Sequence, residues 1–193
     1  MLQAGDPLPG GAPDGAEGGS ERERLAVFDE AVAEIAARAQ VAYRQADGWF
    51  EQTRAGLIEL LRFCDEHPDT ARELVIDSIA WGPEVLARRS RLLDALAAVL
   101  DRGREQTEPA TVVPPETAAS LVGASLSWVQ TRLVSEQGSF VELAPSLMSM
   151  IAHPYLGPQA AKRELERSLA YAGAEAPGRE SERPVAGVRE RSY

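Results

Sequence analysis

The sequence predicts an all-α fold. Through most of the chain, apolar residues recur three and four positions apart, which is the spacing of one face of a helix. No segment alternates apolar and polar residues as a half-buried strand does, and no internal repeat appears. Gly and Pro residues interrupt the helical pattern at several points. Together these observations predict about seven helices.

The two ends of the chain differ in composition from its middle. Residues 1–20 hold six Gly and three Pro, and such a segment buries too little apolar surface to fold. Residues 173–193 are similar, with Gly, Pro and mixed charges. The chain has 193 residues, of which 44% are hydrophobic. It is therefore expected to have a disordered leader over 1–20, one folded domain over 21–172 and a disordered tail over 173–193.

The first two expected helices lie before residue 68. Apolar residues at helical spacing predict a helix over 28–46, and Gly48 breaks this pattern. A second helix begins at Trp49 and ends at His67, because the residue before a proline avoids the helical region.

The third and fourth helices flank a short break. A helix over 71–79 is ended by Trp81-Gly82-Pro83, and Pro83 suits the first turn of the next helix. That fourth helix extends to Leu100, and Arg89 interrupts its apolar stripe. A polar connection over 103–115, which holds three prolines, follows it.

The last three helices complete the domain. A helix over 116–136 begins with Glu116, an acid in the first turn, where the helix dipole favours negative charge. A sixth helix is expected over 140–152 and a seventh over 159–172. The segment 154–158, with a proline at each end, is expected to be a tight break between them.

Two of these late helices are almost free of charge. Residues 117–131 and 143–161 contain no Asp, Glu, Lys or Arg, although 26% of the whole chain is charged. Two adjacent helices of this composition cannot both be half-solvated, and we expect a second copy of the chain to cover them. The candidates for this dimer interface are Leu121, Ser125, Trp128, Arg132, Leu147, Met148 and Ile151.

Composition argues against several other classes of protein. The net charge is -10, which opposes a free-standing nucleic-acid binder. The N-terminus lacks the pattern of a signal peptide, and prolines and polar residues break the longest uncharged stretch, so no membrane span is expected. Cys64 is the one cysteine, so no internal disulfide can form and a reducing cytoplasm is expected.

No constellation of residues suggests catalysis or a metal site. His67 and His153 each precede a proline at a helix end, and neither has a second His or a Cys at ligand spacing. We therefore expect no metal, no cofactor and no enzymatic activity. The large aromatic residues fall on different helices, and they suit either a packed core or a ligand cavity. They are Trp49, Phe50, Phe63, Trp81 and Trp128.

Several short motifs follow one another from Phe28 onward. They are Gly48-Trp49, Leu57-x-x-Leu60-Leu61-x-Phe63-x-x-x-His67-Pro68, Trp81-Gly82-Pro83, Pro115-x-Thr117-Ala118, Leu121-Val122-Gly123-Ala124 and His153-Pro154-Tyr155-Leu156-Gly157-Pro158-Gln159-Ala160-Ala161. In this order and spacing the chain resembles the C-terminal, ligand-sensing and dimerising part of TetR/AcrR-family transcriptional regulators.

The resemblance implies a TetR-like C-terminal helical domain with a four-helix-bundle dimer interface. The fifth and sixth helices would pack with their copies, and a small-molecule cavity would lie among the second to fifth helices. The family shares no ligand motif, so the candidates for the cavity are chosen by helix face and size. They are Leu57, Leu61, Trp81, Leu93, Leu96 and Trp128.

Family members begin with a three-helix DNA-binding unit, and the residues before Phe28 do not supply one. This chain alone is thus not expected to bind nucleic acid. The expected function is that of the effector-sensing and dimerisation domain of a repressor-type TetR regulator. It would be a cytoplasmic homodimer that binds an unknown small apolar or amphipathic effector.

The alternative is a stand-alone helical interaction protein that heterodimerises with a full-length regulator, without ligand or catalysis. A helical-bundle enzyme would need convergent acid, base or metal groups, and we find none in the sequence.

Overall fold

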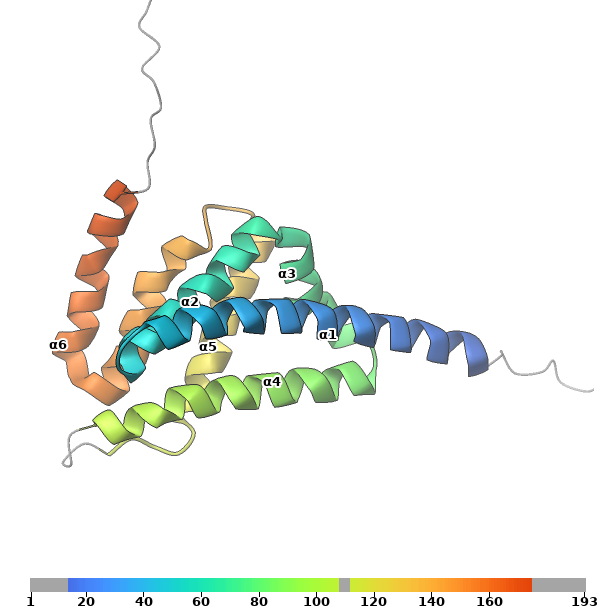
Figure 1. The fold of residues 1–193 in the computed structure, drawn as a ribbon, viewed down its shortest axis with the longest axis horizontal. Helices are drawn as coiled ribbons and strands as arrows, with labels where there is room; N and C mark the ends of the chain where they lie inside the picture. Colours follow the sequence, from blue (N-terminus) through green and yellow to red (C-terminus); the bar gives the residue numbers. More distant parts are fainter. Residues whose placement is uncertain (1–13, 108–111, 175–193) are drawn as a thin grey trace, which may run out of the picture.

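The computed structural model describes residues 14–107 and 112–174, and within them the chain forms six α-helices, three short 3₁₀ helices and no β-strand (Figure 1). The predicted all-α class is confirmed over these residues. Most of the expected leader and tail lies outside the described residues. The first helix nevertheless begins at Asp14, inside the expected leader, and the last one ends at Ala174.

Two long helices pack along each other at the start of the fold. Helix α1 spans Asp14–Gln45 and α2 spans Trp49–Glu66. Gly48 joins them with a φ of 79°, a left-handed conformation that glycine adopts without strain. Arg38 of α1 forms ion pairs with two carboxylates of α2, Glu59 at 3.7 Å and Glu66 at 2.7 Å.

The middle of the chain folds into α3 and α4. Helix α3 spans Pro68–Val75 and is followed by the 3₁₀ helix η1, Asp77–Ala80, so the single helix expected over 71–79 is two short ones. Gly82 has a φ of 110°, and Pro83 then occupies the first turn of α4, Pro83–Asp101. The 3₁₀ helix η2, Arg102–Gln106, continues α4 into the connection.

The last two helices are α5, Thr117–Ser135, and α6, Ala144–Ala174, with the 3₁₀ helix η3, Val141–Leu143, before α6. The sixth and seventh expected helices are two arms of α6. They meet at Gly157, whose φ of 81° and ψ of 174° are not helical. The first arm continues through Pro154, two residues beyond the expected end at residue 152, because a proline interior to a helix can kink it without ending it. The second arm stands at one end of the molecule (Figure 1).

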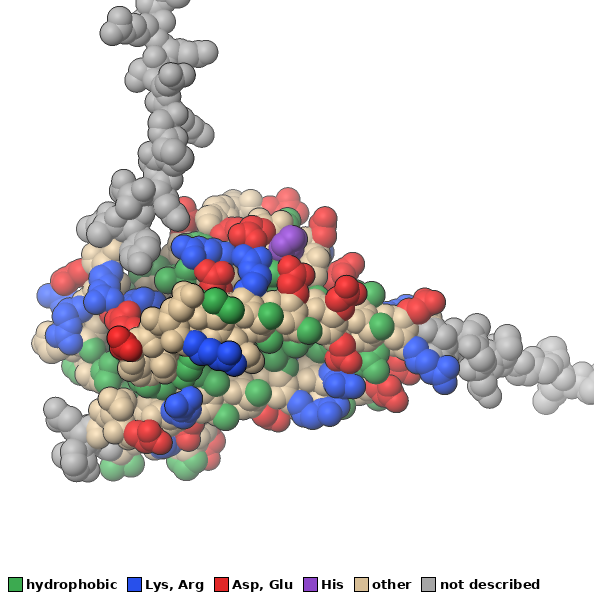
Figure 2. All heavy atoms as spheres, viewed as in Figure 1, with side chains coloured by type: hydrophobic (Ala, Val, Ile, Leu, Met, Phe, Trp, Pro, Cys, Tyr) green, Lys and Arg blue, Asp and Glu red, His purple; other side chains and the backbone are tan. Residues whose placement is uncertain are grey.

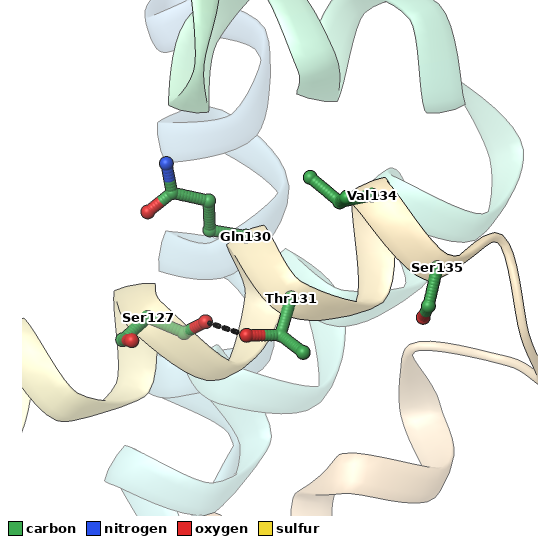
Figure 3. Close-up of a pocket in the computed structure, with 5 residues that line it drawn as sticks. All are labelled: Ser127, Gln130, Thr131, Val134 and Ser135. Atoms are coloured by element: carbon green, nitrogen blue, oxygen red, sulfur yellow. Dashed lines mark hydrogen bonds between the residues drawn. The ribbon is translucent and has the colours of Figure 1, made fainter.

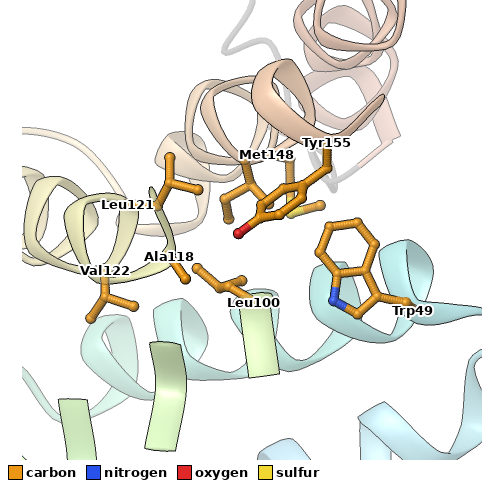
Figure 4. Close-up of a cluster of buried hydrophobic side chains, with 8 residues drawn as sticks. Trp49, Leu100, Ala118, Leu121, Val122, Met148 and Tyr155 are labelled. Carbon is orange, nitrogen blue, oxygen red and sulfur yellow. The ribbon is translucent and has the colours of Figure 1, made fainter. Parts of the chain in front are cut away.

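Buried side chains of α2, α4, α5 and α6 meet in the main core cluster (Figure 4). Its members are Trp49, Leu100, Ala118, Leu121, Val122, Met148, Ile151 and Tyr155. The ring of Trp49 lies edge-on to that of Tyr155, with 5.2 Å between centroids, and its Nε1 donates to the carbonyl of Val99 at 2.9 Å. A Cβ at Gly103 would collide with the same indole, so only glycine fits there.

A second cluster joins α2, α3, α5 and the start of α6. Its members are Leu61, Ala71, Leu133, Phe140, Leu143, Ala144 and Leu147. Asp65, near the end of α2, fixes the chain beside this cluster. Its carboxylate accepts hydrogen bonds from Ser139 Oγ at 2.7 Å, from the backbone N–H of Phe140 at 2.7 Å and from that of Val141 at 3.1 Å. The turn between α5 and α6 is thus held to α2 by one side chain.

Acidic and basic side chains are interspersed over the face that α1 and α4 form (Figure 2). Arg88 of α4 lies 3.4 Å from Asp29 of α1, and such exposed pairs contribute little to stability. This face has the composition of an ordinary solvated surface.

Candidate functional site

The exposed residues of α5 form a surface without charge. They are Ala119, Ser120, Gly123, Ser127, Trp128, Thr131, Val134 and Ser135, and we call them the α5 outer face. The exposed fraction of Trp128 is 44% and that of Val134 is 68%. A helix turned to water in a chain that is 26% charged would ordinarily carry Lys, Arg, Asp or Glu on this side. The α5 outer face is therefore the strongest candidate for an interaction surface.

Several hydroxyl groups of α5 are satisfied by the helix itself. Thr131 Oγ1 donates to the carbonyl of Ser127 at 2.9 Å, and Ser125 Oγ donates to that of Leu121 at 2.8 Å. Ser135 Oγ donates to the carbonyl of Arg132 at 3.3 Å. A hydroxyl that already donates to a carbonyl of its own helix loses fewer hydrogen bonds when a partner displaces water from it. The polar residues of this helix therefore oppose burial against a partner less than their type suggests.

A depression of about 330 Å³ lies on the C-terminal half of the same helix (Figure 3). Its lining residues all come from α5: Ser127, Gln130, Thr131, Val134 and Ser135. We call it the α5 depression. It is a shallow, open hollow and not an enclosed cavity, and Trp128 is not among its lining residues.

Four of the seven residues expected at a dimer interface lie inside the chain's own core. Leu147 and Met148 are 0% exposed, and Leu121 and Ile151 are also buried. In the protomer these four side chains face the core and not the surface, and the dimer interface itself remains a prediction. The outward sides of the uncharged segments carry mainly small residues, with Trp128 as the large exception.

The other three interface candidates lie nearer to solvent. Ser125 is half-buried, and Trp128 is exposed. Arg132 donates to the carbonyl of Ser139 at 3.1 Å and lies 3.3 Å from the carboxylate of Glu142, so it braces the turn after α5. Of the seven candidates, Trp128 is the one that presents a large apolar side chain to the outside.

The six residues expected to line a ligand cavity do not converge on one. Leu61 is buried in the second core cluster, and Leu57, Leu93 and Leu96 pack half-buried against the main cluster. Trp81 is half-buried at the end of η1, and Trp128 faces outward. None of the first five lines the α5 depression. The aromatic residues of α2 are thus core residues, one of the two interpretations that the sequence left open.

One polar group of the main cluster has no partner among the residues that the structure describes. The side chain of Tyr155 is 2% exposed, and its hydroxyl forms no hydrogen bond there. Burial raises the pKa of this hydroxyl, and the negative charge of Asp101 adds to the effect. No signal in the sequence points to this, because an aromatic residue in a helix predicts burial and says nothing of its hydroxyl.

Cys64, on α2, is half-buried. Burial raises the pKa of the Cys64 thiol to about 12, so it is protonated and unreactive at neutral pH. Over residues 14–107 and 112–174, no three His, Cys, Asp or Glu side chains gather as a metal site would require. Within the same ranges, no helix is both long and apolar enough to cross a membrane.

Comparison with known proteins does not extend these findings. The chain matches no protein-family model, no curated protein and no solved structure.

Proposed function

We propose that this chain is the dimerisation and effector-sensing domain of a TetR-type transcriptional regulator, and that it pairs with a second copy through the α5 outer face. The observation that carries the proposal is the absence of charge from every exposed position of α5. Each copy has a net charge of -10, so two copies repel each other. This repulsion is weakest where neither copy presents a charge, and the α5 outer face meets that condition on both partners.

The size of this surface indicates how the two copies would pair. A helix of 19 residues is about 28 Å long and, at a width of about 10 Å, offers a strip of about 300 Å². A stable dimer buries about 800 Å² on each partner. Helix α5 alone falls short, so the first arm of α6 has to contribute. Its more exposed side carries Ser146, Ser149 and His153, and 143–161 holds no Asp, Glu, Lys or Arg. Two helices from each copy make a four-helix interface.

Sedimentation velocity from low to high micromolar concentration tests this proposal. The wild-type chain is expected to sediment as a dimer, and Thr131→Glu, which places a charge on the α5 outer face, as a folded monomer. Ala98→Glu, at an exposed position of α4, is the matched control and should leave the dimer intact. A wild-type chain that remains monomeric throughout, with full helicity by circular dichroism, would refute pairing through α5.

The buried hydroxyl of Tyr155 supports the second part of the proposal, which is effector sensing. An unpaired polar group in an apolar cluster costs free energy, and a small amphipathic molecule with one hydrogen-bonding group would relieve that cost. Gly157, two residues further along, is the point at which α6 departs from helical geometry. A ligand at Tyr155 would therefore act beside the bend between the two arms of α6.

Thermal unfolding with a panel of small amphipathic compounds tests this second function. A compound that binds only the folded state raises the midpoint as its concentration rises. The shift should be present in the wild-type protein and absent in Tyr155→Phe, while Tyr43→Phe, on α1, should keep it. Shifts that are equal in all three proteins would mean that Tyr155 is not part of the site.

A further inference from the structure

The two arms of α6 are joined by a break in the helical backbone. Gly157 has a φ of 81° and a ψ of 174°, and a Cβ placed there would meet nothing within 4 Å, so the space on that side of the residue is open. Pro158 follows it and has no N–H, so the usual helical hydrogen bond to the carbonyl of Pro154 cannot form. The second arm, residues 158–174, can therefore turn about Gly157 without breaking the helix in either arm.

Few apolar side chains attach the second arm to the rest of the fold. Over residues 158–167, Ala160 and Ala161 are the buried apolar residues, and they pack against Phe50 and Leu156. The largest apolar side chain in this range, Leu165, is 50% exposed. Two methyl groups remove far less apolar surface from water than a leucine or a phenylalanine does. Apolar contacts thus hold this arm less firmly than they hold α2, α4 or α5, whose leucines fill the core clusters.

Charged side chains supply the rest of the attachment. The buried carboxylate of Glu164 pairs with Arg54 of α2, and Arg54 also pairs with Glu51 at 2.8 Å. Arg167 of the arm completes the network, 3.3 Å from Glu51 and 3.9 Å from Glu164. The guanidinium of Arg54 also lies over the ring of Phe50, 5.1 Å from its centroid. When the arm moves away, all four charged groups regain water, so the desolvation cost of the closed form is recovered.

We propose that the second arm of α6 is a hinged strap that opens as a unit about Gly157 while the rest of the fold stays intact, and that the pair of Arg54 with Glu164 is the latch that holds it closed. Opening uncovers Phe50 and Leu156, which pack against both the arm and the main cluster. The inference needs neither the dimer nor the effector of the proposed function. It adds a second conformation of the protomer, in which an apolar patch next to Tyr155 is open to solvent.

Native-state hydrogen exchange on the full chain tests the strap, read residue by residue by NMR as urea is raised in small steps below the unfolding transition. The amides of 162–167 donate within the second arm and those of 148–152 within the first. The first set is expected to share one free energy of opening, with little dependence on urea, and to exchange at least about a hundredfold faster than the second set. Arg54→Met should speed exchange of the first set at least about tenfold. Arg62→Met, the same change on the same helix, is the control and should leave that exchange unchanged.

Several results would overturn the inference. If the two sets share one urea dependence and one free energy of opening, the arm opens only with the whole fold. If protection falls steadily from 162 to 167, the arm frays from its end and does not move as a unit. Exchange of the first set that is the same in Arg54→Met as in the wild-type protein would remove the latch. None of these results bears on sedimentation or on thermal shifts with added compounds, by which the proposed function is tested.

Discussion

Arg54 on α2 forms an ion pair with Glu164 on the second arm of α6, 110 positions further along the chain. The side chain of Arg54 is 12% exposed and that of Glu164 is 5% exposed. Burial works to lower the pKa of the Arg54 guanidinium, but hydrogen bonds to Glu164 and Glu51 outweigh it and the pKa is raised. Among the side chains that the structure describes on the second arm, Ala160 and Ala161 are buried against the core, and Arg167 forms a further ion pair with Glu51 at 3.3 Å. The ion pair is therefore a principal attachment of that arm.

Arg54→Met should lower the free energy of unfolding by about 3 kcal/mol, because it leaves the Glu164 carboxylate buried without its partner. Chemical denaturation followed by circular dichroism measures the loss. Replacing both partners by Met should recover most of it, since no charge is then left buried. Arg62→Met removes a more exposed pair, with Glu59 on the same helix, and should cost less than about 1 kcal/mol. Equal losses in Arg54→Met and Arg62→Met would show that burial of the pair does not matter.

Asp65→Ala should destabilise the fold by about 2–3 kcal/mol, because the backbone N–H groups of Phe140 and Val141 lose their acceptor. The loss is measured by urea denaturation. Hydrogen exchange of these two amides should also become faster than in the wild-type protein. Asp94→Ala, at an exposed site of α4, is the control and should stay within about 0.5 kcal/mol of the wild type. Unchanged exchange at Phe140 would contradict the assigned role.

Two glycine substitutions should have opposite signs. Gly103→Ala places a methyl group against the indole of Trp49 and should destabilise by about 1–3 kcal/mol through overpacking. Gly56→Ala lies inside α2, where the nearest atom to a new Cβ is a ring carbon of Tyr43 at 3.9 Å, an ordinary contact. It should stabilise by up to about 1 kcal/mol, since alanine favours the helix. Thermal denaturation compares the two proteins, and the same sign for both would refute the packing described at Trp49.

Tyr155→Phe should stabilise the protein by about 1 kcal/mol at neutral pH, because it removes a buried hydroxyl that lacks a partner. A loss of stability would mean instead that the hydroxyl has a partner. The pKa of Tyr155 is raised in the folded state, so on raising the pH above the ordinary value of 10.0 the unfolded chain loses this proton first. Stability should then fall with pH more steeply in the wild-type protein than in Tyr155→Phe. Denaturation at neutral and alkaline pH measures both effects.

The sequence by itself determined the all-α class, some of the helix boundaries and the two uncharged segments. These are local properties, since a proline after His67 or a glycine at position 48 acts on its own backbone. The same local signals placed the ends of α2 and α4 close to where the structure has them.

The tertiary structure alone decided which side of each uncharged helix faces outward. Helical periodicity places Val122 and Thr131 on opposite sides of α5 but does not say which side meets the core; Val122 is buried in the main cluster and Thr131 is exposed. The pairing of Arg54 with Glu164 and the hydrogen bonds that Asp65 accepts from residues 139–141 join residues far apart in the chain. Such contacts depend on how the helices pack, and no local pattern of residues records them.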